Sequence, residues 1–235
     1  MTSRYFGLIA AAGTGSRFGG AAPKQYHALA GRPMLHHAVR GLLAAGEIET
    51  VFVVLAPDDG LFRGYDWSEF GDRLAPLYCG GSSRHDSVLN GLVAASSVVD
   101  PEDWVLVHDA ARPCLGKVEL RRLIDTVARE GTGGILAVPV ADTLKRADAQ
   151  GDVVETVDRT GLWAVQTPQL FRADVLRAAY SRPDIAAATD DAALLERAGR
   201  RVVVVSSTPG NVKITTPGDL PLAGAVLSWE VEADV

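Results

Sequence analysis

Cysteine is scarce in this chain, and its two cysteines form no metal-binding pattern. Cys79 and Cys114 are the only ones among 235 residues. They lack the close spacing of a zinc or redox motif, so we expect two buried, reduced thiols.

Long apolar runs are also missing, because no stretch is long enough to cross a bilayer. The first dozen residues faintly resemble a signal peptide, with Arg4 ahead of an apolar run that ends in alanines. That run is at the short limit for such a signal, and cleavage there would destroy the glycine-rich loop that follows it. We therefore expect a cytoplasmic protein with no membrane partner.

Positive charge is outnumbered by negative charge, with 23 Lys and Arg against 29 Asp and Glu and a net charge of -6. This balance argues against broad electrostatic attraction to nucleic acid. A phosphate-bearing ligand would need a local cluster of cations. With 47% hydrophobic residues, the chain can bury a full core, as one large domain or one domain with an appendage.

Strand and helix patterns alternate along most of the chain. Apolar runs predict strands at 6–12, 51–56, 77–79, 104–108, 135–140 and 201–206, and helical spacing predicts helices at 34–45, 83–96, 117–129 and up to Arg197. Residues 216–219 are expected to start the last helix. This order predicts an α/β fold, a Rossmann-like, mostly parallel sheet with helices on both faces.

The alternation breaks at residues 141–171, a polar stretch with a Gly151-Asp152 turn signal between two extended segments. We expect a β-hairpin arm that projects from a single domain spanning 1–235. An isolated hairpin is marginally stable, so the arm should pack on something. A second subunit is one possibility, and the arm's own domain is the other.

The most informative stretch is residues 6–24, where a buried strand leads into a glycine-rich turn at Gly13 and Gly15. Glycines let backbone N–H groups approach an anion closely. Arg17 and Lys24 then add fixed positive charge. The combination predicts a phosphate-binding loop that also stabilises a phosphoryl-transfer transition state.

Two known glycine motifs fit this loop poorly. Gly13, Gly15 and Gly19 are spaced one residue off the dinucleotide-binding fingerprint, and the acidic residue that such a site needs is missing from its expected position. The Walker pattern fails because no Gly-Lys-Ser/Thr follows.

Further candidates follow later strands, where open α/β sheets bind ligands. They are the segment 80–87, the segment 109–112 and Lys213, which we expect on one face of a strand with an anion as partner. Asp109 could bind a metal, accept a hydroxyl proton or cap a turn. Arg112 could pair with Asp109 or bind phosphate. His85 and His108 are interpreted as structural.

Taken together, these motifs resemble the 2-C-methyl-D-erythritol 4-phosphate cytidylyltransferases of the non-mevalonate isoprenoid pathway. The resemblance runs nearly end to end and rests on AAAGTGSRFG and PKQY near the start, then GGSSRHDSV, VLVHDAARPC, TVDRTGLWAVQTPQLF and NVKIT. It implies joining of CTP and methylerythritol phosphate to give a CDP-alcohol and pyrophosphate, with Mg²⁺ held largely by the CTP phosphates. It also implies a homodimer joined by the β-arm at 141–171.

The resemblance assigns a role to each matching residue. Arg17, Lys24, Arg159 and Lys213 would be catalytic; Ala11, Ala12, Gly13, Gly15, Gly81, Ser82, Ser87 and Ala110 would bind CTP, with Arg84 supporting that loop; Asp109, Arg112, Thr143, Arg159, Thr167 and Lys213 would bind the acceptor. Arg159 and Thr143 would reach the neighbouring subunit's site. Two alternatives stay open, a cytidylyltransferase for ribitol 5-phosphate or another pentitol phosphate and a non-catalytic nucleotide-binding regulator.

Overall fold

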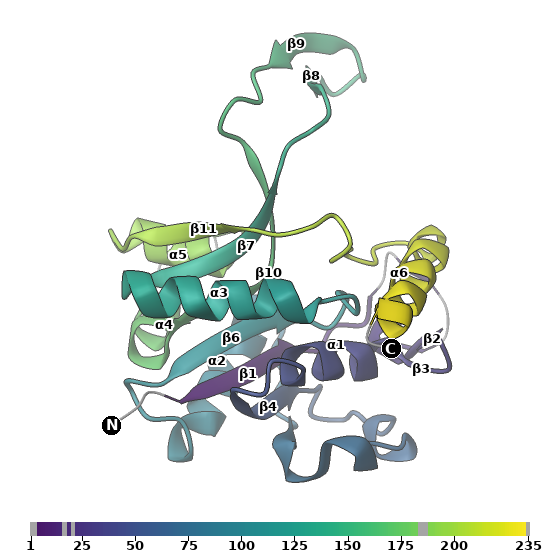
Figure 1. Ribbon diagram of the computed structural model, residues 1–235, viewed down its shortest axis with the longest axis vertical. Helices are drawn as coiled ribbons and strands as arrows, with labels where there is room; N and C mark the ends of the chain where they lie inside the picture. The colour runs from purple at the N-terminus through teal and green to yellow at the C-terminus, as the bar shows by residue number, and fades with distance from the viewer. Residues whose placement is uncertain (1–3, 16–17, 20–21, 183–187, 234–235) are drawn as a thin grey trace.

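A seven-stranded sheet forms the centre of the molecule (Figure 1). The structure is a computed structural model that describes residues 4–15, 18–19, 22–182 and 188–233, the last four without their side chains. The strands lie in the order β11-β7-β10-β6-β1-β4-β5. They are β1 (Tyr5–Ala10), β4 (Ile48–Val54), β5 (Leu74–Leu77), β6 (Trp104–Asp109), β7 (Gly133–Pro139), β10 (Trp163–Arg172) and β11 (Val202–Ser206).

Neighbouring strands run parallel except at β10, which is antiparallel to both β6 and β7. The predicted mostly parallel sheet is therefore confirmed. The β-branched runs form its central strands because both faces of the sheet are covered. In β4, Val51 and Val53 belong to one core cluster, whereas Phe52 and Val54 belong to the other.

Helices cover both faces, as predicted. They are α1 (Met34–Leu43), α2 (Arg84–Ala94), α3 (Lys117–Glu130), α4 (Ala173–Tyr180), α5 (Asp191–Arg197) and α6 (Leu220–Ala233). Side chains of α1 and α3 pack in one cluster and those of α2, α4 and α5 in the other. Helix α6 packs by the glycine-rich loop, through Ala223 and Leu227 against Phe18. In the described part of the chain, every helix is too short or too polar to span a membrane.

Short elements complete the fold. They are the two-residue strands β2 (Ala28–Leu29) and β3 (Arg32–Pro33) and the 3-10 helices η1 (Lys24–Tyr26), η2 (Phe62–Gly64), η3 (Ser68–Arg73), η4 (Ala95–Ser97) and η6 (Pro217–Asp219). In η6, Thr216 and Asp219 form the capping box that leads into α6, as its sequence predicts.

One expected strand is absent, because residues 211–215 are irregular in the structure. The prediction that Lys213 lies on a strand is wrong. The β-branched residues around it suggested a strand, but no neighbouring strand pairs with this segment. A backbone hydrogen bond from Ile214 N–H to the Ala111 carbonyl, at 2.8 Å, ties this segment to the turn after β6.

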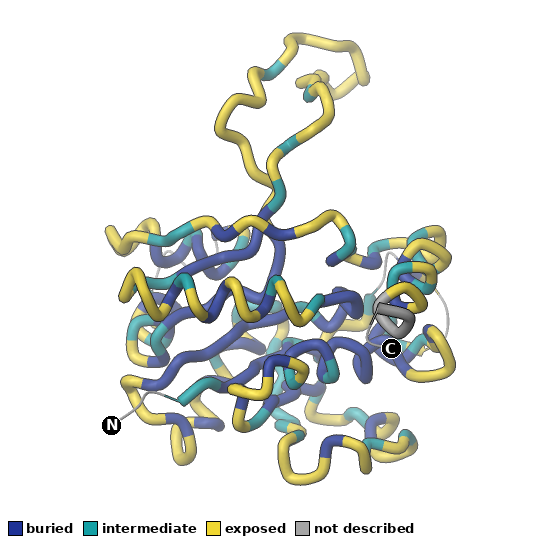
Figure 2. Tube along the Cα trace, in the orientation of Figure 1, coloured by how far each residue is buried: buried dark blue, intermediate teal, exposed yellow. Residues whose placement is uncertain are grey.

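The predicted hairpin is present, as β8 (Leu144–Ala147) and β9 (Val153–Val157), and it projects from the body of the molecule (Figure 1). Nearly all of it is exposed to solvent (Figure 2). Residues 166–171 of the predicted arm are instead buried in the main sheet as part of β10. The projecting part is therefore shorter than 141–171, because the returning strand completes the sheet.

Candidate active site

A polar cleft of about 570 Å³ opens at the carboxyl ends of β1 and β6, beside the start of α2. Open α/β sheets bind ligands at such strand ends. The cleft is lined by Ala10, Ala11, Ala12, Gly13, Thr14, Gly15, Lys24, Gln25, Gly81, Ser82, Ser83, Arg84, Ser87, Asp109, Ala110, Ala111 and Lys213. All eight residues predicted to bind CTP line this cleft, and so do Lys24, Asp109 and Lys213.

The glycine-rich loop forms the first wall of the cleft and brings Lys24 to it. Gly15 has a φ of 68°, and a Cβ there would lie 2.6 Å from the Cβ of Lys24. Only glycine therefore allows the two segments to approach this closely. The Lys24 ammonium donates to the Ile214 carbonyl at 2.8 Å, and the Gln25 amide donates to the Ala11 carbonyl at 2.6 Å. Arg17, the other predicted catalytic cation of this loop, lies outside the described residues.

The second wall is a rigid turn at the start of α2. Ser83 caps the helix in a reciprocal box with Asp86. The Ser87 hydroxyl accepts from Gly81 N–H at 3.1 Å and donates to the Ser83 carbonyl at 2.9 Å. A Cβ on Gly81 would lie 2.2 Å from the Cβ of Asp86, so this turn requires glycine. The Gly81 backbone and the exposed Ser82 are thus held beside the cleft.

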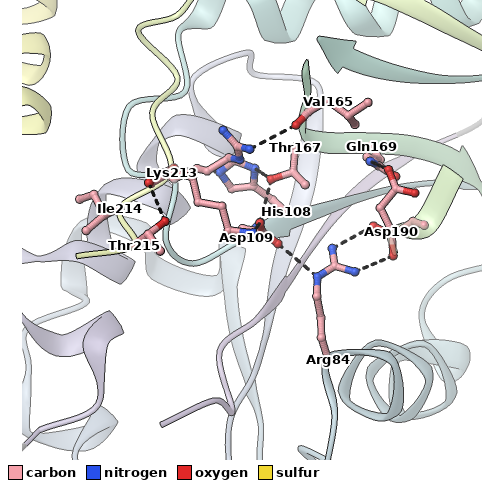
Figure 3. A network of polar contacts seen from close by, with 12 residues as sticks. Arg84, His108, Asp109, Val165, Thr167, Gln169, Asp190, Lys213, Ile214 and Thr215 are labelled. Atoms are coloured by element: carbon pink, nitrogen blue, oxygen red, sulfur yellow. Dashed lines mark hydrogen bonds and ion pairs between the residues drawn. The ribbon is translucent and has the colours of Figure 1, made fainter. Parts of the chain in front are cut away.

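Asp109 is the centre of charge on the third wall (Figure 3). Its carboxylate accepts from the Lys213 ammonium at 2.7 Å and from the Arg84 Nε at 3.2 Å. Burial by itself would raise the pKa of Asp109, but the two cations overcome this effect and hold the pKa well below its usual value. Asp109 is therefore ionised at neutral pH.

Arg84 is in turn fixed by a buried carboxylate that sequence reasoning missed. Both of its terminal nitrogens lie 2.9 Å from Asp191 oxygens, and the Tyr180 hydroxyl also donates to Asp191. The Asp191 side chain has no exposed surface. Burial, together with the Asp191 charge, raises the pKa of Tyr180 far above its usual value. The sequence signal here was the start of the helix that runs to Arg197, and Asp190 is the residue that caps it.

Arg112 does not form the ion pair with Asp109 that was one of the two roles considered from sequence. Its guanidinium donates to the backbone carbonyls of Asn211 at 2.7 Å and Val165 at 3.4 Å, and among the described residues it pairs with no carboxylate. Burial lowers the pKa of Arg112, although the Asp109 charge opposes this. The site therefore contains a buried guanidinium whose charge no carboxylate in direct contact neutralises.

His108 and Thr167 lie next to the turn that carries Asp109 (Figure 3). The His108 Nδ1 is 3.0 Å from the Thr167 hydroxyl, and its Nε2 is 3.0 Å from the Arg112 carbonyl. The same hydroxyl lies 3.0 Å from the Asp109 N–H. Complete burial lowers the pKa of His108 to about 4, so the ring is neutral at physiological pH.

Four predicted site residues in the described part of the chain do not line the cleft. Arg112 and Thr167 are buried beside the turn that begins at Asp109, and the other two are in the arm. Thr143 and Arg159 lie in the exposed arm, just before β8 and just after β9. That arm extends away from the body of the molecule (Figure 1).

Comparisons with known proteins identify relatives over almost the whole chain. The family model for 2-C-methyl-D-erythritol 4-phosphate cytidylyltransferase matches residues 6–229. The enzyme of that name from Laribacter hongkongensis is 51% identical, covering 97% of this chain and 98% of its own, and that from Dechloromonas aromatica is 50% identical, covering 95% and 97%.

Solved structures agree with the sequence relatives. A crystal structure of 4-diphosphocytidyl-2C-methyl-D-erythritol synthase superposes with a TM-score of 0.84 at 35% identity, covering 97% of this chain and 99% of that one. The geometry of the cleft, the fold and the near-complete matches lead to one conclusion: the chain belongs to the 2-C-methyl-D-erythritol 4-phosphate cytidylyltransferase family.

Proposed function

We propose that this enzyme transfers the cytidylyl group of CTP to 2-C-methyl-D-erythritol 4-phosphate in the polar cleft, releasing pyrophosphate. The observation that carries the proposal is the meeting of three cations, Lys24, Lys213 and Arg84, at one glycine-lined cleft of an acidic protein. The family match supports the same substrates.

The reaction joins two anions, so its first requirement is cancellation of charge. An oxygen of the acceptor phosphate attacks the α-phosphorus of CTP in line, a P–O bond forms, and pyrophosphate leaves with the electrons of the broken bond. Catalysis of this type depends mainly on positioning and electrostatics, with no covalent protein intermediate. We assign the stabilisation of α-phosphate charge to Lys24 and Arg17, and the triphosphate and ribose contacts to the backbone at 11–15.

The nucleotide's base fits the second wall. Gly81, Ser82 and Ser87 belong to the rigid turn before α2, where the Ser82 and Ser87 hydroxyls donate to the Asp86 carboxylate and the Ser83 carbonyl, so their oxygens are fixed and can accept a further hydrogen bond. Ala110 adds a small, buried surface beside them. We assign these four residues to the cytidine.

The acceptor fits the third wall. Asp109 presents an ionised carboxylate that can accept hydroxyl hydrogens of a polyol, and Lys213 presents an ammonium for its phosphate. Before the acceptor binds, the Asp109 carboxylate and the Lys213 ammonium neutralise each other's charge. Arg112 ends the turn that begins at Asp109, and the Thr167 hydroxyl of β10 contacts the Asp109 N–H. Both side chains are at least nine-tenths buried, and we assign them to the inner end of this site.

The residues that line the cleft fit a magnesium ion that is bound mainly by the phosphates of the nucleotide. Asp109 is the only carboxylate among the lining residues, and the described part of the chain holds no cluster of three metal-binding side chains. Mg²⁺ commonly binds through substrate phosphates, waters and at most one or two carboxylates. When bound, it would neutralise phosphate charge, with the CTP phosphates as its main ligands.

The exposed arm supports a homodimer in which each arm completes the neighbouring site. Val153 and Val154 are each 63% exposed, and Leu162, Trp163 and Val165 are also exposed on or near the arm. Apolar side chains in such numbers on a thin hairpin favour burial against a second copy. Arg159 and Thr143 would then reach the partner's acceptor site. Cys79 and Cys114 are not joined by a disulfide, which fits a cytoplasmic location, where cysteines stay reduced.

The test is a substrate matrix. The enzyme is incubated with each of the four ribonucleoside triphosphates and with methylerythritol phosphate, ribitol 5-phosphate or other polyol phosphates, and pyrophosphate release is measured. The proposal expects release only with CTP, and fastest with methylerythritol phosphate. Faster turnover of ribitol 5-phosphate would reassign the acceptor. No release with any pair would reduce the protein to a nucleotide binder.

A further inference from the structure

The turn from Asp109 to Arg112 is held at both ends by one pair of side chains. The turn is closed by a hydrogen bond from Arg112 N–H to the Asp109 carbonyl at 3.0 Å. Thr167 contacts its first residue, at the Asp109 N–H, and His108 contacts its last, at the Arg112 carbonyl. The two side chains then meet each other. The turn that carries two acceptor-binding residues is thus enclosed in a ring of hydrogen bonds.

The hydrogens of this ring can be placed by elimination. A carbonyl oxygen only accepts, so the contact with Arg112 requires a proton on the His108 Nε2. The neutral ring then has a lone pair on Nδ1, which can only accept. The Thr167 hydroxyl must therefore donate to His108 while its oxygen accepts from Asp109 N–H.

We infer that His108 is a positioning residue of the acceptor site: it orients the Thr167 hydroxyl and, through it, fixes the Asp109–Arg112 turn. The inference rests on the proposed acceptor role of that turn. Thr167 gives its one hydrogen to His108, so its oxygen can only accept a further hydrogen bond. A substrate group that meets it must be a donor, such as a polyol hydroxyl.

An imidazole that only filled space in the core would not need hydrogen bonds at both of its nitrogens. His108 is entirely buried, and an apolar side chain at its position would leave the Arg112 carbonyl and the Thr167 hydroxyl without these partners. The charges and hydrogen bonds that act on the His108 imidazole come from Asp109, Arg112 and Thr167. All three residues are assigned to the proposed acceptor site.

The direct test is ¹⁵N NMR of the histidine side chains in the full-length enzyme. The chain has five histidines, so the His108→Leu variant identifies the His108 signals. We expect a neutral ring with its proton on Nε2 and a hydrogen-bonded, unprotonated Nδ1. The Nδ1 signal should shift in Thr167→Val and return in Thr167→Ser. A proton on Nδ1, or no response to Thr167→Val, would overturn the inference.

Kinetics provide the second readout and do not require the leucine variant to fold. Thr167→Val should raise the KM for the acceptor about tenfold, the size expected for loss of one hydrogen bond, and leave the KM for CTP within about twofold. Thr167→Ser should behave as wild type. The matched control is Thr132→Val, which removes a threonine hydroxyl outside the cleft that donates to the Arg201 carbonyl.

The two readouts separate this inference from the proposed function. The NMR result does not depend on turnover, so the expected tautomer in a protein without cytidylyl transfer would reject the function alone. Equal rises in both KM values for Thr167→Val would show a general structural role and reject the inference alone.

Discussion

At the scale of single residues, the main feature of the cleft is that its charged groups are held in fixed positions. Lys24 is held beside Gly15 and bound to the Ile214 carbonyl, so its ammonium is fixed before any ligand arrives. A donor that is already in position costs little free energy of reorganisation during the reaction, which is why such groups stabilise transition states effectively.

We expect Lys24→Ala to lower turnover at saturating substrates by about 10²–10³-fold, as for other preorganised donors, with the fold intact. Steady-state kinetics and the thermal unfolding midpoint are the measurements. Lys117→Ala, an exposed lysine at the start of α3, is the control and should keep full turnover. Near-normal turnover of Lys24→Ala would contradict its role.

Asp109 gives a prediction on pH and stability. Its pKa in the folded protein lies below the unfolded value of about 3.9, so ionised Asp109 stabilises the fold above that pH. As the pH falls below 4, the unfolded chain takes up the proton first. The contribution is then lost at about 1.4 kcal/mol per pH unit until the folded pKa is reached.

The measurement is urea unfolding of wild type and Asp109→Asn between pH 7 and pH 2.5. The stability difference between them should be constant down to about pH 4.5 and shrink below it. Asp148→Asn, at the exposed arm turn, is the control. A difference that stays constant throughout the acid range would show that Asp109 is not stabilised as an anion.

At the scale of elements, sequence periodicity predicted the buried strands and most helices well. The run at 51–56 and the helix at 117–129 correspond closely to β4 and α3. Strand β10 was missed as a member of the sheet because its first half belongs to the arm. Strand β5 begins earlier than expected, at Leu74.

In the site, residues that are close in sequence could be predicted, whereas contacts between distant residues could not. Lys24 and the glycines were found from their spacing, because the loop is contiguous in sequence. Asp191 could not be found as the partner of Arg84, since 107 positions separate the two residues. The histidine at 108 was interpreted as structural for a similar reason, as its contact with Thr167 depends on how β10 lies in the sheet.

The arm is the element whose exposed apolar surface predicts assembly. Val154→Asp would place a carboxylate on that surface, and burying a charge without a partner is strongly unfavourable. We expect the variant to sediment as a monomer while its body remains folded. Gln150→Asp, which adds the same charge in the exposed turn, should leave the mass unchanged. A wild-type protein that sediments as a monomer would contradict the homodimer.

At the scale of the whole molecule, the proposal makes each active site the product of two chains. Arg159→Ala damages the arm's contribution and Lys24→Ala damages the cleft. In a mixed dimer, one of the two sites would combine an intact cleft with an intact arm. Mixing the two inactive variants should therefore restore part of the activity, measured as pyrophosphate release. No recovery in dimers shown to be mixed would argue against a shared site.

The overall charge makes the local cluster necessary. A molecule of net charge -6 repels CTP and the acceptor at a distance, so the cations Lys24, Arg84 and Lys213 that line the cleft must offset this repulsion locally. The most direct measurement is a crystal structure with CTP bound. We predict that the triphosphate lies along residues 11–15, with its α-phosphate within about 3 Å of the Lys24 ammonium. An α-phosphate placed away from both Lys24 and Arg17 would contradict the account.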